Sequence, residues 1–357
     1  MSKIVLSEQN VRNFILPGMK ATKYLSELKN KKLLPLFSND KRLPLIARLI
    51  GSLFSDGGLY HSRANNYREI HFTLGQKEDA QELTSDLCQL GFKAHVRERV
   101  TQNKVGGREF QLHTHRVKCC STALWVLFVA LDVPVGKKTK QNYFVPDWIL
   151  CASSEVKKEF LKGYIGGDGP KVTVGLTERK KKQPCNTIQI NDIEFYKQER
   201  FLDSGLKYAL QLKELLACFD VDVTRIFSKE LILNEQKIQV IHISISSAVK
   251  SAYAYCKLGY AYCKQKQDAI TDVTQFLELL RQKRTEWSQK YLEALDLYNS
   301  KNKSIIEISK SLNLSKNTVY GWVKQGKKPT IGYHKIKYPA WLNERYQNGN
   351  RTKQRNL

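Results

Sequence analysis

The chain has 357 residues, enough for two or three domains with a sizeable hydrophobic core. Its 59 Lys and Arg outnumber 34 Asp and Glu, and the net charge of +25 indicates a polyanionic partner, nucleic acid rather than a membrane. No apolar run reaches the roughly 20 residues of a membrane span, and the first ten residues lack a signal-peptide core. We therefore expect an intracellular protein, in an organelle or a prokaryotic cytoplasm, that is not secreted.

Cysteine and histidine spacing argues against zinc. The eight cysteines form no C-x-x-C pair, and the seven histidines form no H-E-x-x-H arrangement. We expect reduced, mostly buried cysteines.

The first part of the chain alternates helical and strand-like patterns. Residues 1–40 are predicted to be an irregular, basic lead-in with one short helix, and Pro44 suits the first turn of the next helix. Beyond that helix, which ends at Gly57-Gly58, the predicted elements are strands 60–63 and 69–74, helix 77–90, strands 93–100 and 108–117, and helix 121–131. We place a first half-domain and its linker at residues 41–152.

The same order of elements then returns. The predicted elements are helix 155–166, strands 172–176 and 187–192, helix 206–219, strands 223–228 and 239–246, and helix 248–257. Asp56 and Asp168 are 112 positions apart, whereas Leu87 and Leu215 are 128 apart, which indicates an insertion of about 16 residues near 180–200. We read this as a diverged duplication, with a second half-domain at residues 153–285.

Residues 286–357 are predicted to be a separate basic tail. Residues 304–324 read as a helix, a short turn and a second helix, with Ser315 as the N-cap of the second. Residues 301–357 hold 13 basic and 2 acidic residues. The pattern resembles a helix-turn-helix, whose second helix enters the major groove. The alternative is a plain helical hairpin.

Two matching helix ends carry the chemical argument. Leu49–Gly57 and Leu161–Gly169 both follow the pattern L-x-G-x-x-x-x-D-G. An acid at the C-terminal end of a helix is disfavoured by about 0.3–1 kcal/mol. One Asp-Gly end alone would be an ordinary turn, but two matching ends indicate a paired site that needs negative charge.

The spacing of small residues predicts how the two ends meet. Gly51 and Ser55, and likewise Gly163 and Gly167, share a helix face. If the helices pack there, Asp56 and Asp168 come together, and their repulsion favours a bound divalent cation. We expect Mg²⁺, with Mn²⁺ or Ca²⁺ able to substitute in binding. The last helical carbonyls, of Ser55 and Gly167, are expected to be free as further ligands.

The two motifs, with strand pairs between them, resemble those of LAGLIDADG homing endonucleases in the single-chain, two-motif form, over about residues 41–285. The segments Tyr143–Trp148 and Phe160–Tyr164 resemble the region between the repeats of that family. The resemblance implies an α+β fold of two pseudo-symmetric αββαββα half-domains with saddle-shaped antiparallel sheets, here followed by the small all-α tail.

The resemblance also implies the catalytic residues. Asp56 and Asp168 would bind metal and activate water, and a basic residue would lie near each scissile phosphate. Lys264 matches that position in the second half, and Lys138 matches it in the first, with Lys137 as an open alternative. The alternative to a catalytic role is that these lysines bind phosphate or lie in a solvated basic loop.

Polar residues on the strands are expected to face DNA. His71 and Thr73 share one strand face, as do Gln111, His113 and His115, then Gln189 and Asn191, and then His242 and Ser244. The arginine candidates are Arg63, Arg68, Arg97, Arg99, Arg108 and Arg225. The tail candidates are Lys316, Asn317, Tyr320 and Lys324.

The function implied is a monomeric, metal-dependent, site-specific endonuclease. It would make a double-strand break with short 3′ overhangs in a long DNA target and so spread its own intron or gene. Two alternatives stay open: a non-catalytic DNA-binding transcriptional regulator on the same scaffold, and an RNA maturase that binds intron RNA.

Overall fold

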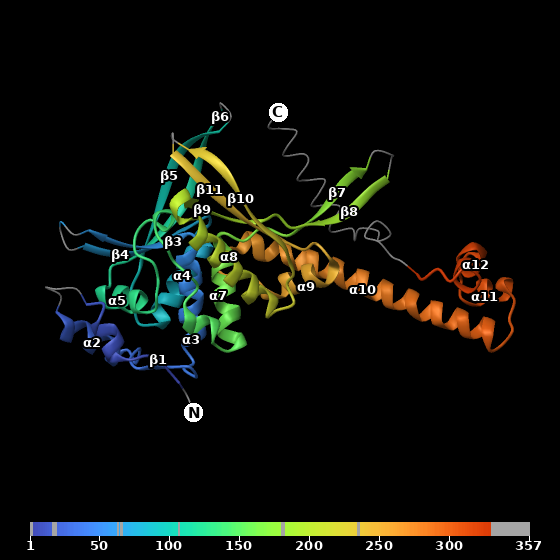
Figure 1. Ribbon diagram of the computed structural model, residues 1–357, viewed down its shortest axis with the longest axis horizontal. Coiled ribbons are helices and arrows are strands. Elements are labelled where there is room, and N and C mark those ends of the chain that lie inside the picture. Colours follow the sequence, from blue (N-terminus) through green and yellow to red (C-terminus); the bar gives the residue numbers. More distant parts are fainter. Residues whose placement is uncertain are drawn as a thin grey trace. The chain divides into compact units, whose positions relative to one another are not determined.

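We describe the protein from a computed structural model, shown in Figure 1. The described residues are 3–15, 20–62, 64, 67–105, 108–179, 183–233 and 236–329. They form two units, which we treat separately. One unit holds the described residues of Met1–Val172 and Ile190–Ile270, and the other holds those of Thr173–Gln189 and Thr271–Leu357.

The first half-domain has the predicted order of elements. They are α3 (Leu43–Phe54), β3 (Gly57–Ser62), β4 (Tyr67–Leu74), α4 (Lys77–Gln89), β5 (His95–Val105), β6 (Arg108–Cys119) and α5 (Thr122–Ala130). The four strands form one antiparallel sheet in the order β3-β4-β6-β5. Ile70, Phe72 and Val117 are fully buried on one face of this sheet, where α4 and α5 pack.

The second half-domain contains one strand more than predicted. Its elements are α7 (Ser154–Gly167), β7 (Thr173–Arg179), β8 (Gln183–Gln189), β9 (Ile193–Gln198), α8 (Leu202–Ala217), β10 (Val223–Leu233), β11 (Gln236–Ile245) and α9 (Val249–Leu258). The prediction of two strands before α8 is wrong, because the predicted insertion contains β9. The sheet β10-β11-β9 is three-stranded, and β7 and β8 form a separate hairpin.

Helices α3 and α7 lie side by side at the centre of the first unit (Figure 1). Their backbones touch at the predicted glycines. A Cβ on Gly51 would lie 2.1 Å from the backbone oxygen of Phe160, and one on Gly163 would lie 2.0 Å from that of Arg48. Any larger residue at either position would push the helices apart, so the glycines fix how closely the two halves meet.

The lead-in is more ordered than the prediction of one short helix. It contains β1 (Ile4–Leu6), α1 (Glu8–Arg12), α2 (Ala21–Asn30) and β2 (Leu36–Phe37). Strands β1 and β2 pair, and Leu25 and Leu28 of α2 are buried. The linker between the halves holds the 3-10 helix η1 (Lys138–Lys140) and α6 (Asp147–Leu150), and η2 (Glu199–Phe201) precedes α8.

Helix α10 (Lys264–Asn299) runs without a break through the boundary predicted at residue 286. It is followed by α11 (Ile305–Ser311) and α12 (Lys316–Val323), the two helices predicted for the tail. The Ser315 hydroxyl caps α12 by accepting from the N–H of Thr318, as predicted. Ile308, Val319 and Trp322 pack against Ala294 and Leu297 of α10, which supplies a third helix to this small core.

No helix among the described residues combines the length and apolar character needed to cross a bilayer.

Candidate active site

The two acidic helix ends meet, as the sequence predicts. Asp56 follows the last residues of α3, and Asp168 is the C-cap of α7. A Cβ on Gly167 would lie 2.8 Å from Asp56 Oδ2 and 2.4 Å from Ser55 Oγ. Gly167 therefore leaves the space that the Asp56 side chain occupies against the end of α7.

Lys138 reaches the end of α3 from the linker. Its ammonium donates to the carbonyl oxygens of Leu53 at 3.0 Å, Phe54 at 2.9 Å and Gly57 at 3.1 Å, and also to that of Ser55. These carbonyls carry the partial negative charge of a helix C-terminus, which an ammonium group neutralises. Lys137, the open alternative, is exposed.

Lys266 does the same at the end of α7. Its ammonium donates to the carbonyl oxygens of Ile165 at 3.4 Å, Gly166 at 2.8 Å and Gly167 at 2.6 Å. Lys264, named from the sequence for this role, instead donates its backbone N–H to Asp79 Oδ1 at 2.7 Å, and its side chain is exposed. The structure thus places Lys266, and not Lys264, as the counterpart of Lys138.

A signal for Lys266 was present in the sequence. The offset of 128 positions that relates Leu87 to Leu215 also relates Lys138 to Lys266. The triplets Lys138-Thr139-Lys140 and Lys264-Gln265-Lys266 both read K-x-K, and matching their first lysines selected Lys264 in place of Lys266.

Asp56, Asp168, Lys138 and Lys266 lie close enough to shift one another's pKa values. Burial raises the pKa of Asp168 to about 7, although Lys138 opposes the shift and Asp56 adds to it. Burial also raises the pKa of Asp56, against Lys138 and Lys266. Asp56 is exposed on one side, so we take its shift to be the weaker of the two. Burial lowers the pKa of Lys138 to about 8 and lowers that of Lys266, while both acids oppose these shifts.

The donor set fits a hard divalent cation that shares its shell with a phosphate. Mg²⁺ commonly uses one or two carboxylates together with water and substrate phosphates. Asp56 and Asp168 supply that pair, and the described residues contain no group of three or more His, Cys, Asp or Glu side chains that could hold a metal alone. The Ser55 and Gly167 carbonyls are not free, contrary to expectation, because the two lysines donate to them.

The polar face of the first sheet can be read from its strand register. Thr73 pairs with Arg116 and Arg116 pairs with Arg97, so all three side chains share a face. His71 is two positions before Thr73, and Arg99 is two positions after Arg97, so both also lie on this face. Thr73, Arg97 and Arg99 are exposed, and His71 is half-buried.

The strand candidates of this half, all expected to face DNA, lie on two opposite faces of the sheet. His115 pairs with Leu74, so Gln111, His113 and His115 lie on the opposite face from Thr73. Arg68 is also on the far side, buried with its guanidinium 5.6 Å from the centre of the Trp125 ring.

A buried acid organises the polar face of the first half. The Glu69 carboxylate pairs with Arg116 Nη2 and with Lys118 Nζ, each at 2.6 Å, and lies 3.6 Å from His71 Nδ1. The Tyr67 hydroxyl donates to Glu69 at 2.6 Å. These basic side chains are therefore held in place before any partner arrives.

The second half also gathers polar side chains on one face, but its acid, Glu194, is exposed. Arg225 donates from Nε to Ser244 Oγ at 3.3 Å, and its guanidinium lies 4.3 Å from the centre of the Phe227 ring. The His242 ring stacks on Phe227 at 4.6 Å, and its Nδ1 lies 3.2 Å from Glu194. His242 and Ser244 are buried and Arg225 is exposed, all on one face.

The remaining candidates do not gather at this site. Gln189 ends β8, whereas Asn191 lies in the exposed loop before β9, so they do not share a strand. Arg63 and the side chain of Arg108 lie outside the described residues. Lys316, Asn317 and Tyr320 are exposed on α12, and Lys324 Nζ lies 4.8 Å from the Tyr298 ring.

Comparison with family models gave no match. Among curated proteins, the chain is 27% identical over 230 residues to the RNA polymerase subunit Rpo1N of Methanocaldococcus jannaschii, covering 62% of this chain and 16% of that protein. It is 32% identical over 202 residues to the tRNA-splicing ligase RtcB of Pyrococcus abyssi, covering 56% and 21%. The replication factor C small subunit of M. jannaschii is 29% identical over 216 residues, covering 59% and 11%. The chain spans between 11% and 26% of the length of the curated relatives it matches.

Among solved structures, the chain resembles three LAGLIDADG proteins at low identity. Mesophilic variants of the homing endonuclease I-DmoI match at 14% identity and a TM-score of 0.34, covering 60% of this chain and 96% of theirs. The homing endonuclease I-WcaI, bound to its DNA recognition sequence, matches at 13% and 0.36, covering 74% and 96%. The N-terminal LAGLIDADG domain of WhiA matches at 11% and 0.30, covering 61% and 83%. The proteins of known structure that this chain is similar to are LAGLIDADG homing endonucleases and the LAGLIDADG domain of WhiA.

Proposed function

We propose that the chain is a LAGLIDADG homing endonuclease that cuts both strands of a specific DNA site. One observation carries the proposal: two acids meet at the ends of paired central helices, and a partly buried lysine reaches each helix end. A duplicated acid-lysine pair suits a reaction carried out twice, once on each strand of a duplex.

Asp56 and Asp168 are the residues that would hold the divalent metal. When bound, Mg²⁺ lowers the pKa of an attacking water and stabilises the leaving oxygen. The raised pKa of Asp168 shows that burial opposes an uncompensated negative charge there, a condition that a cation relieves. Lys138 and Lys266 hold the helix ends and supply positive charge where a phosphate would approach.

The polar sheet faces supply the proposed DNA contacts. In the first half these are His71, Thr73, Arg97 and Arg99, and in the second Arg225, His242 and Ser244. In the first half, buried Glu69 pairs with Arg116 and Lys118 and so orients basic groups before binding, and in the second His242 lies 3.2 Å from exposed Glu194. The exposed residues of α12 would extend the contacted site, and the net charge of +25 would supply sequence-independent affinity.

The curated relatives support a mobile origin for the matched region. The names of these relatives, a polymerase subunit, a ligase and a replication factor, describe unrelated activities. The part of each relative that matches this chain is a small share of that relative's own length. A segment shared by such different proteins behaves as a separable module. This fits an enzyme whose cut, with short 3′ overhangs, spreads its own intron or gene.

The test begins with the full chain and a library of random DNA duplexes, with and without Mg²⁺. We expect cleaved duplexes to converge on one long target. On that target, the double variant Asp56→Asn, Asp168→Asn should lose more than about a hundredfold in cleavage rate. Even the loss of a residue that only hydrogen-bonds to a metal ligand lowers activity about 10–100-fold. Asp268→Asn, an exposed acid on α10, is the matched control and should cleave normally.

Full cleavage by the double variant would overturn the proposal. Selective binding of one duplex without cleavage by the native chain would instead identify a DNA-binding regulator. Binding of intron RNA without DNA cleavage would identify a maturase.

A further inference from the structure

Each lysine lies at a loop that joins two helices. Lys138 lies on the loop between α5 and α6, here called the Lys138 loop, and Lys266 lies in the first turn of α10, directly after the loop from α9, here called the Lys266 loop. Each lysine caps the motif helix of its own half. The groups that hold each loop in place come largely from the other half.

The Lys138 loop is held by β9 and α8. Lys197 of β9 donates from Nζ to the backbone oxygens of Lys138 at 3.2 Å and Gln141 at 2.7 Å, and lies 3.6 Å from the centre of the Tyr143 ring. Lys197 has 0% relative exposure. A lysine is seldom buried in this way unless it is paired, so its contacts with this loop explain its position.

A second contact reinforces the first. Gln211 of α8 accepts the backbone N–H of Val145 at 2.9 Å, and the Tyr208 ring packs edge-on against Tyr143 at 4.9 Å. The segment that carries Lys138 therefore rests on the second half-domain over several residues.

The Lys266 loop is held by α4 of the first half-domain. Asp79 accepts the N–H of Lys264, and the Tyr262 hydroxyl donates to Asp86 Oδ2 at 2.6 Å. Asp79, Asp86 and Tyr262 are all buried. Two carboxylates of one helix thus fix the backbone just before Lys266.

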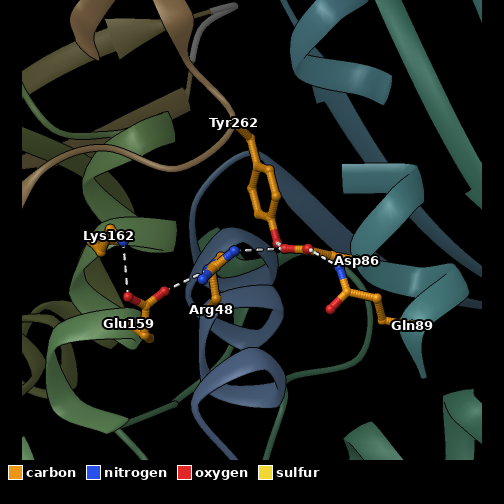
Figure 2. Close-up of polar contacts among 6 residues, drawn as sticks. All are labelled: Arg48, Asp86, Gln89, Glu159, Lys162 and Tyr262. Atoms are coloured by element: carbon orange, nitrogen blue, oxygen red, sulfur yellow. Dashed lines mark hydrogen bonds and ion pairs between the residues drawn. The ribbon is translucent and has the colours of Figure 1, made fainter. Parts of the chain in front are cut away.

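Figure 2 shows how the Asp86 carboxylate is itself held. Arg48 of α3 donates from Nη1 to Asp86 Oδ2 at 3.0 Å and from Nε to Glu159 Oε2 of α7 at 2.5 Å. Gln89 donates to Asp86 Oδ1 at 3.2 Å, and Lys162 pairs with Glu159 at 2.8 Å. Two cations balance two anions, so the network joins α3, α4 and α7 to the loop without an uncompensated buried charge.

We propose, on the basis of the function above, that Tyr262 and Lys197 are positioning residues that make each catalytic lysine depend on the opposite half-domain. Tyr262, through Asp86, sets the position of Lys266, and Lys197 sets that of Lys138. The two strand cuts are then coupled through reciprocal anchors, and neither half can place its lysine alone.

The first test measures lysine position without any need for activity. The full chain is labelled briefly with an amine-reactive reagent, and the modification of each lysine is followed by mass spectrometry. Tyr262→Phe should raise the labelling of Lys266 about fivefold, the size expected for one lost hydrogen bond, and leave Lys138 unchanged. Lys197→Met should raise the labelling of Lys138 and leave that of Lys266 unchanged. Lys316, exposed on α12, serves as the internal standard.

The second test measures strand preference. On a cognate duplex labelled separately on each strand, Tyr262→Phe should slow one strand cut and Lys197→Met the other, each through kcat rather than KM. Lys197→Arg keeps N–H donors at this position and should restore the balance. If Lys197→Met does not fold, Gln211→Leu removes only the Val145 contact and should shift labelling and strand preference in the same direction.

The outcomes separate this inference from the proposed function. Unchanged labelling of Lys266 in Tyr262→Phe and of Lys138 in Lys197→Met, or an equal rise of both lysines in either variant, overturns the reciprocal anchors even if the native chain cuts DNA. Selective labelling in a chain that cuts no DNA supports the anchors and counts only against the endonuclease.

Discussion

Four influences act on the Asp168 carboxyl group. Burial raises its pKa, Asp56 adds to the rise, and Lys138 and Lys266 oppose it, with a net value of about 7. An unfolded Asp ionises near pH 3.8. Between these values the folded state binds more protons than the unfolded state, so the free energy of unfolding falls as pH rises from about 4 to about 7.

Replacing this acid should therefore stabilise the metal-free protein. We expect Asp168→Asn to melt higher than the native chain at pH 8, by at least about 2 °C, since about 1 kcal/mol moves Tm by ~2–4 °C at this size. At pH 4 the difference should vanish, because both side chains are then neutral in the folded state. Calorimetry in the presence of a chelator measures this.

The exposed Asp268→Asn serves as the control and should melt like the native chain at both pH values. A lower Tm for Asp168→Asn at pH 8 would contradict the assignment of a costly charge to this residue.

At this scale the sequence was most informative where chemistry and backbone coincide. Asp56 and Asp168 lie at helix ends that meet, as the spacing of the small residues predicts. Arg68 and His115 were misplaced because strand alternation gives two faces but not which of them is covered by helices. Arg68 lies against Trp125 of helix α5 and His115 pairs with Leu74 of the neighbouring strand, and neither contact can be read from the sequence.

Among the elements, the α3–α7 pair shows how backbone contact sets geometry. A Cβ on Gly51 would fall far inside contact distance of the Phe160 oxygen, and this atom belongs to a helix backbone that cannot move alone. Glycine is required here because it alone has no side chain, and not because of its flexibility.

We expect Gly51→Ala to destabilise the first unit by about 1–3 kcal/mol, as overpacking does, and to weaken cleavage of both strands alike. Thermal melting followed by circular dichroism measures the first effect. Gly75→Ala is the control: a Cβ there would meet nothing within 4 Å, and the melting curve should not change. An unchanged Tm for Gly51→Ala would show that the helices can separate without cost.

Strand β9 was not predicted from the sequence because of one of its residues. Its inward positions are Ile193, Phe195 and Lys197, all buried. A lysine at an inward position breaks the apolar alternation that identifies a strand, and only the loop contacts of Lys197 explain its burial. In the lead-in the sequence predicted one short helix where the structure has two helices and two strands. Helix α2 buries only Leu25 and Leu28, which leaves little apolar periodicity to recognise.

For the whole molecule, the surplus of positive charge predicts strong salt dependence. A protein that neutralises several phosphates loses affinity as salt rises, with a slope set by the number of contacts. We expect Lys316→Gln on α12 to reduce the slope of log K against log salt by about 1. Fluorescence anisotropy with the cognate duplex measures the slope.

Lys250→Gln is the matched control, because Lys250 of α9 is an exposed lysine that already pairs with an acid, Asp220, at 2.9 Å. Its slope should equal that of the native chain. Equal slopes for all three proteins would place α12 away from DNA and leave its helices a structural appendage.

Gly167 and Ser55 hold equivalent places in the two motifs but differ in size. A Cβ on Gly167 would lie 2.4 Å from Ser55 Oγ, so the seryl side chain fills the space that its partner leaves empty. Two copies of the first half would bring serine against serine, and two copies of the second would leave a void. The two motif ends therefore fit each other better than either would fit a copy of itself, and this contact favours the joining of two unlike halves over the pairing of two identical ones.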